Sequence, residues 1–242
     1  MLEESRRLSG RVHTVIAERA RQNGVRVDEF VYDSAGRLQS YVFRGPDGYE
    51  FRRTPIYDEQ GKEIRPGTQV FRRSDGSRTE VQQIKADSWS MDLLQGIGFG
   101  THGATCVETR FRPDGTPDET IFFTDDREEI SRLRYTCDEA GRVIDATQYI
   151  TDSELFRAIF QYDEHGLVIE ERVLFAGALT HRTVYAYNDK GDLASATVEA
   201  GGPSPHTDRF EYEYDSNGNW VRKLVHHSLG TDEIRRRITY FQ

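Results

Sequence analysis

The residue types that most often carry chemistry are scattered along this chain. Its seven histidines show neither H-x-x-x-H nor H-x-H spacing, which are common arrangements of zinc ligands. The glycine-rich segment 96–103 is not followed by the Gly-Lys-Ser/Thr of a phosphate-binding loop, and no G-x-S-x-G nucleophile motif occurs. Asp125-Asp126 and Glu128-Glu129 are typical of a solvated turn. The sequence therefore predicts no metal and no cofactor, and it favours a protein that is not an enzyme.

One segment does combine residues suited to binding. Residues 87–103 contain Trp89, His102 and four glycines. An indole ring offers a flat apolar surface with one N–H donor, and glycines allow backbone to approach a ligand closely. We therefore predict Trp89 and His102 as ligand-binding residues. The alternative is an inserted loop in which Trp89 covers the end of the core.

The net charge limits the kinds of molecule that the protein is expected to bind. A formal net charge of -9 argues against broad binding to a phosphate backbone, so we expect no nucleic acid partner. Of the 32 basic residues only four are lysine, which leaves 28 arginines. Arginine's planar fork suits the bridging of carboxylates on neighbouring strands. A codon bias of the source genome is the alternative explanation.

The cysteines and the apolar segments indicate in which cellular compartment the protein is expected. Cys106 and Cys137 match no C-x-x-C spacing, and a single bridge between them stays open. Residues 1–20 contain no apolar core of a signal peptide, and no later run approaches 18 apolar residues. We expect no membrane insertion, and these residues taken alone favour the cytoplasm.

The elements that position these residues come from a repeat. The motif Y-D-x-x-G occurs at residues 32–36, 57–61, 162–166 and 214–218. Degenerate copies occur at 111–115, 137–141 and 187–191, with shorter Asp-Gly turns at 47–48 and 75–76. An Asp at the corner bonds to backbone two residues on, and the closing Gly takes a positive φ in a type I turn with a G1 bulge. Each copy therefore predicts a β-hairpin.

The residues that precede each corner alternate as in half-buried strands. Leu133 and Tyr135, for example, are separated by Arg134. The glycine interval is about 12 residues early and about 25 late, as expected if late hairpins carry the motif at every second turn. We predict that four aromatic residues share one buried face: Tyr135, Phe160, Tyr185 and Tyr212.

Composition agrees with an extended sheet. Counting glycine and leaving out tyrosine gives about 40% apolar residues, against about 45–50% in typical domains. We predict an all-β fold, an antiparallel meander of YD-like hairpins curved into an open or closed barrel-like sheet. It forms one repeat-built domain over residues 1–242, with short-period hairpins at 25–86, an irregular insertion at 87–103 and hairpins of about 25-residue period at 104–242.

The N-terminal segment 1–24 fits two structures. Val12, Val15, Ile16 and Ala20 follow helical spacing, and Asn23-Gly24 would end a helix. This favours a short N-terminal helix. The same dipeptide also favours a hairpin that links strands 11–21 and 25–32.

Segments 209–223 and 182–193, R-F-E-Y-E-Y-D-S-N-G-N-W-V-R-K and R-T-V-Y-A-Y-N-D-K-G-D-L, resemble the YD repeats of RHS (rearrangement hot spot) proteins. The resemblance implies antiparallel strips that spiral into a shell, often in secreted or surface-attached bacterial proteins. Some members enclose a toxin or bind carbohydrate.

Three functions follow as hypotheses. We favour a non-catalytic binding or interaction module whose ligand is a glycan or a protein. The first alternative is a structural shell fragment of a larger assembly, which implies self-association. The second is an enzyme, a hydrolase, built on a β scaffold from carboxylates that meet in the folded sheet.

Overall fold

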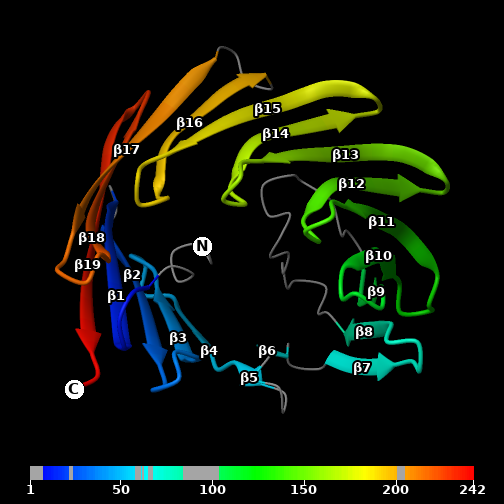
Figure 1. Cartoon of the computed structure of the whole chain (residues 1–242), viewed down its shortest axis with the longest axis horizontal. Helices are drawn as coiled ribbons and strands as arrows, with labels where there is room; N and C mark the ends of the chain where they lie inside the picture. The colour runs from blue at the N-terminus through cyan, green and yellow to red at the C-terminus, as the bar shows by residue number, and fades with distance from the viewer. Residues whose placement is uncertain are drawn as a thin grey trace. The chain divides into compact units, whose positions relative to one another are not determined.

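A computed structural model describes residues 8–21, 24–57, 61, 63–64, 68–83, 104–200 and 205–242. These residues form nineteen β-strands and no helix, which confirms the all-β prediction (Figure 1). None of the described residues belongs to a helix that could cross a membrane. All the strand pairs whose register is given below are antiparallel.

The chain divides into two compact units. Unit 1 comprises Met1–Pro66, Asp192–Ser195 and Thr207–Gln242, and unit 2 comprises Gly67–Gly191 and Ala196–His206. A single repeat-built domain stays a prediction.

In unit 1 the first and last of the described strands, β1 and β19, pair with each other. The strands are β1 (Val12–Arg21), β2 (Gly24–Tyr32), β3 (Leu38–Arg44), β4 (Glu50–Arg53), β5 (Ile56–Tyr57), β6 (Glu63–Ile64), β17 (His206–Tyr214), β18 (Trp220–His227) and β19 (Gly230–Tyr240). The pairs β4–β3, β3–β2, β2–β1, β1–β19, β19–β18 and β18–β17 form one series. β5 and β6 pair separately.

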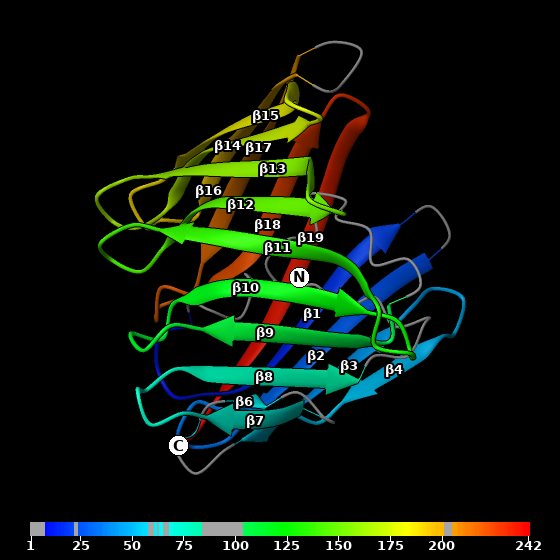
Figure 2. The ribbon, with the colours of Figure 1, turned by 90° about the vertical axis from the view of Figure 1, so that its right-hand side faces the viewer.

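Unit 2 is a meander in chain order. Its strands are β7 (Thr68–Arg72), β8 (Arg78–Gln83), β9 (Cys106–Phe111), β10 (Pro117–Phe123), β11 (Glu129–Cys137), β12 (Val143–Ile150), β13 (Ser153–Tyr162), β14 (Val168–Phe175) and β15 (Ala178–Tyr187). Each pairs with the next, and Figure 2 shows β7 to β13 lying side by side. The remaining strand, β16 (Leu193–Ala200), has residues in both units, and His206, the first residue of β17, also belongs to unit 2.

The predicted N-terminal helix is wrong, and the alternative hairpin is right. Residues 12–21 form β1, which pairs with β2 on one side and β19 on the other. A β-bulge between Val12 and Thr14 shifts the alternation by one residue. Val12 and Val15 consequently face the same core although they are three residues apart, as on a helix. Pairing on both edges satisfies the backbone of β1 without a helix.

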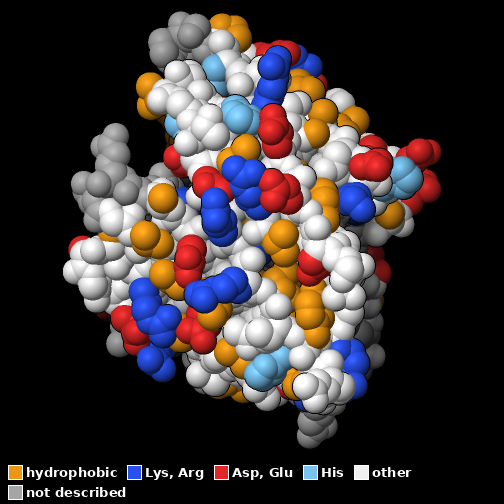
Figure 3. All heavy atoms as spheres, turned by 90° about the vertical axis from the view of Figure 1, so that its left-hand side faces the viewer, with side chains coloured by type: hydrophobic (Ala, Val, Ile, Leu, Met, Phe, Trp, Pro, Cys, Tyr) orange, Lys and Arg blue, Asp and Glu red, His pale blue; other side chains and the backbone are white. Residues whose placement is uncertain are grey.

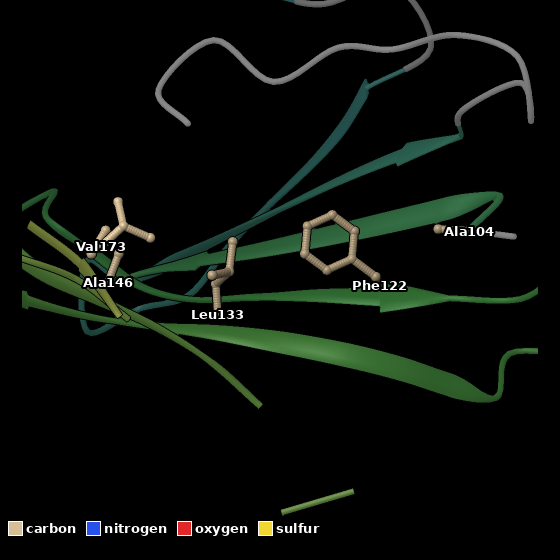
Figure 4. Close-up of a cluster of buried hydrophobic side chains, with 6 residues drawn as sticks. Ala104, Phe122, Leu133, Ala146 and Val173 are labelled. Atoms are coloured by element: carbon tan, nitrogen blue, oxygen red, sulfur yellow. The ribbon is translucent and has the colours of Figure 1, made fainter. Parts of the chain in front are cut away.

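The strands bury one face. In unit 2 the buried cluster consists of Ala104, Phe122, Leu133, Ala146, Ala158 and Val173 (Figure 4). In unit 1 two clusters form, one of Val12, Val15, Phe30 and Tyr32 and the other of Ala17, Trp220 and Ile234. Leu133 is 1% exposed while the next residue, Arg134, is exposed, so the predicted alternation is confirmed there.

The four aromatic residues predicted on a buried face are half-buried. Tyr135 and Phe160 pack against the unit 2 cluster, and Tyr212 packs against the second unit 1 cluster. Tyr185 points its hydroxyl to Glu171 on β14 at 2.8 Å. Burial and the nearby Glu171 carboxylate raise the pKa of Tyr185. These rings border the core rather than fill its centre.

Candidate functional site

Trp89 and His102, the residues predicted to bind a ligand, both lie outside the described residues. Their role stays a prediction. Within the described ranges, no group of three or more His, Cys, Asp or Glu side chains is placed to hold a metal ion. Cys106 and Cys137 are free thiols, so the structure contains no bridge between them.

The recurrent feature of both units is the Y-D-x-x-G corner, and Asp163 organises one copy. Its Oδ1 accepts hydrogen bonds from the backbone N–H groups of His165 (2.9 Å) and Leu167 (2.8 Å). Its own N–H donates to the carbonyl of Leu167, and the Gly166 N–H donates to the carbonyl of Asp163. Gly166 holds φ at 79°, as predicted. The corner is therefore fixed by four hydrogen bonds and one left-handed glycine.

In three corners a second bond joins the corner tyrosine to the preceding corner. The hydroxyl of Tyr162 donates to the carbonyl of Val143 at 2.7 Å, and Val143 lies two residues after the glycine of the preceding corner. Tyr187 makes the same bond to Val168, and Tyr57 makes it to Leu38. The sequence separation is 19 residues in all three. We call this contact the tyrosine latch.

Arginines next to the corner glycines strengthen the same junction. Arg142 pairs with Asp138 at 2.6 Å and lies over the ring of Tyr162, 4.7 Å from its centroid. Hydrogen bonds from the Arg142 side chain and backbone lower the pKa of Asp138. Arg37 has the corresponding partners, Asp33 and Tyr57. Each such arginine links its own corner to the next tyrosine.

Ion pairs join neighbouring strands on the face of the unit 2 sheet opposite the buried cluster. Arg157 on β13 pairs with Asp145 on β12 at 2.6 Å, and Arg182 on β15 pairs with Glu170 on β14. Arg110 on β9 pairs with Glu119 on β10. This is the cross-strand bridging expected from the arginine content. Exposed pairs of this kind contribute about 0–1 kcal/mol each.

An open groove of about 1200 Å³ lies over this part of unit 2. Arg134, Asp145, Arg157 and Arg172 are among the residues that line it. In unit 1 a smaller hollow of about 630 Å³ has the same character, with Glu18, Glu213, Arg222 and Arg237 in its wall. Figure 3 shows basic and acidic side chains interleaved on one surface.

The corner at residues 214–218 has an additional partner in unit 1. Asn219, which is 2% exposed, accepts a hydrogen bond from the Ser9 N–H at 2.6 Å and donates to the Ser9 carbonyl at 2.7 Å. Its Nδ2 also contacts the Tyr240 hydroxyl at 2.9 Å, and that hydroxyl donates to Asp215. Burial and Asp215 raise the pKa of Tyr240.

The sequence motif located the corners but missed the acceptor of each latch and the role of Asn219. The latch acceptor is a backbone carbonyl, which no residue type identifies. The available signal was the constant separation of 21 residues between a corner glycine and the next latch tyrosine, seen for Gly36 and Tyr57 and for Gly141 and Tyr162.

Comparisons with known proteins concern this repeat. A family model described as Teneurin YD-shell matches residues 116–237, which are 122 of the 242 residues. A porin-like protein from Bacteroides uniformis aligns over 96% of this chain and 99% of its own, at 10% identity and a TM-score of 0.49.

Two toxin structures also align. A chain of a TcdB2-TccC3 structure covers 86% of this chain at 14% identity and a TM-score of 0.33. A chain of the Photorhabdus luminescens Tc holotoxin pore covers 90% at 12% identity and a TM-score of 0.32. The aligned region is 14% of the length of each of these two chains. No curated protein matches the sequence.

Proposed function

Because the chain belongs to the teneurin YD-shell family, we propose that it acts as a structural segment of a YD-repeat shell, a stiff antiparallel sheet that associates with further copies or with a larger protein. The match confirms the YD-repeat resemblance seen in the sequence. It favours the structural alternative over the binding module that the sequence favoured.

The observation that carries the proposal is the tyrosine latch. It recurs at Tyr57, Tyr162 and Tyr187 with one geometry, and it ties each of these three corners to the backbone of the preceding one. Such a bond stiffens the row of corners and leaves the tyrosine hydroxyl engaged. The latch residues are thereby explained by their role in building the sheet, with no ligand required.

The ion pairs support the same function. Asp145 and Glu119, which lie in the wall of the large groove, are engaged by Arg157 and by Arg110. Their negative charges are neutralised in place, as suits a surface that holds strands in register.

Association is tested by sedimentation velocity of the full chain over a wide concentration range, together with a glycan array. We expect a concentration-dependent oligomer and no glycan bound. A monomer at every concentration, with a glycan whose binding is lost in Trp89→Ala at unchanged melting temperature, would restore the binding module and place its site at residues 87–103. Trp220→Phe is the control for general loss of a tryptophan.

A further inference from the structure

Gly10 has the conformation of a corner glycine although no Y-D-x-x-G motif surrounds it. Its φ is 82°, against 80° at Gly36, 77° at Gly141 and 79° at Gly166. The residue two positions later, Val12, pairs with Tyr240 at the end of β19. We call a corner covalent where its five residues are consecutive in the sequence. In such a corner the residue two positions after the glycine likewise pairs with the corner tyrosine, as Val168 does with Tyr162.

The details of pairing are also those of a covalent corner. The register shifts at the next residue, so that Thr14 pairs with Thr239, just as Glu170 pairs with Gln161. The Phe241 N–H donates to the Arg11 carbonyl at 2.8 Å, in the position of the bond from Asp163 to Leu167. Residues 10–12 and 240–241 thus reproduce the hydrogen bond, bulge and glycine of the motif.

The sequence agrees with this equivalence. Gly10-Arg11-Val12 repeats the order of Gly141-Arg142-Val143. Gly10 precedes Gly36 by 26 residues (36 minus 10), and Tyr240 follows Tyr214 by 26 (240 minus 214), so both separations are within one residue of the late period of about 25. Tyr240, Phe241 and Gln242 followed by Ser9 and Gly10 supply the five positions of Y-D-x-x-G.

We propose that residues 9–12 and 240–242 together form one corner of the Y-D-x-x-G type, built from two separate segments of the chain. Through this corner β1 pairs with the edge of β19 at which a following repeat would otherwise pair. The partner of this edge is a strand that begins with Gly-Arg-Val, and this chain supplies it from its own residues 10–12.

Side chains hold the two pieces together where the peptide bond is missing. Asn219 holds both backbone groups of Ser9. The Arg11 guanidinium lies 5.7 Å from the centroid of the Phe241 ring, and the His13 ring lies 4.8 Å from it. Phe241 stands where the Y-D-x-x-G corners have Asp, so an aromatic contact replaces the Asp-to-backbone bonds of those corners.

The first experiment measures hydrogen exchange in the unmodified full chain. We expect the Phe241 amide to be protected to the same degree as the Asp163 amide, because both donate across a corner. Exchange of Phe241 at the rate of an unprotected amide would overturn the proposal, and it would do so whatever the oligomeric state found for the shell segment.

The second experiment makes the corner covalent. A permuted chain runs from His165 to Gln242, joins Gln242 directly to Ser9 and ends at Glu164. Its matched control keeps Leu8 at the junction, which lengthens the corner by one residue. We expect the direct junction to melt at the higher temperature, although it lacks the contact of Leu8 with the core. An equal or lower melting temperature contradicts a split corner, and if neither permutant folds, the exchange measurement decides.

Discussion

Asn219 binds both backbone groups of Ser9, a residue 210 positions away in the sequence. Asn219 directly follows the corner glycine Gly218, where two other corners have Arg37 and Arg142. An arginine there reaches back to the corner aspartate and forward to the next tyrosine. The shorter amide instead holds a separate backbone segment, as an amide can both donate and accept.

Asn219→Ala should therefore lower the free energy of unfolding by about 1–3 kcal/mol, since it removes the two hydrogen bonds that the buried Asn219 side chain makes with the backbone of Ser9. Urea denaturation followed by circular dichroism measures the loss. Ser216→Ala, at an exposed position of the same corner, is the control and should change stability little. Equal stability of the two variants would show that Asn219 does not hold Ser9 in solution.

Replacement of the corner glycines tests the turn conformation. Gly166→Ala and Gly218→Ala should each destabilise by about 1–2 kcal/mol, because a β-carbon disfavours positive φ. Apart from Gly218 itself and its two chain neighbours, no residue has an atom within 4 Å of the β-carbon position at Gly218, so strain in the backbone rather than a clash causes the loss there. Gly218→Asn should lose less, since Asn tolerates this conformation. Thermal melts that rank Asn no better than Ala would contradict this explanation.

Removal of one latch hydroxyl should lower the free energy of unfolding. Tyr162→Phe should cost about 0.5–1.5 kcal/mol, the net value of one hydrogen bond, since the ring and its contact with Arg142 remain. Tyr149→Phe is the matched control, because the described part of the chain gives its hydroxyl no hydrogen bond. Chemical denaturation of both variants measures the difference, and losses of equal size would show that the latch does not stiffen the sheet.

The contribution of the corner aspartates to folding stability should fall as the pH is lowered. The pKa of Asp138 is lower in the folded chain because the Arg142 side chain and backbone N–H groups bond its carboxylate. A lowered folded pKa means that the contribution is complete above the unfolded value of about 4 and is lost as the pH falls through the folded pKa.

Asp138→Asn should then show a smaller fall in melting temperature between neutral pH and about pH 3 than the parent chain does. Glu139→Gln, an exposed change in the same turn, is the control. A parent and an Asp138→Asn variant with parallel pH profiles would mean that this carboxylate is not coupled to folding.

The corners and the alternating faces were predictable because both rest on local rules. Asp163 and Gly166 indicate a turn by type and spacing, and Leu133 beside Arg134 indicates a two-sided strand. The N-terminal strand was predicted only as the alternative to a helix, because the bulge between Val12 and Thr14 imitates helical spacing and β1 pairs with β19 at the far end of the sequence. Gly10-Arg11-Val12 repeats a fragment of the motif, but without its tyrosine it is too short to recognise in isolation.

The hairpin between β12 and β13 offers a gain in stability. Its two turn residues, Thr151 and Asp152, hold φ at 47° and 62°, so both occupy the left-handed region that a two-residue type I′ turn requires. Threonine is branched at Cβ and is costly in this conformation. The double change Thr151→Asn with Asp152→Gly should raise the free energy of unfolding by about 0.5–2 kcal/mol, a usual gain for correcting a turn. The next such turn already contains Gly177 after Ala176, so Ala176→Asn should give a smaller gain. Urea midpoints measure both, and a double variant no more stable than the parent would contradict the I′ assignment at residues 151–152.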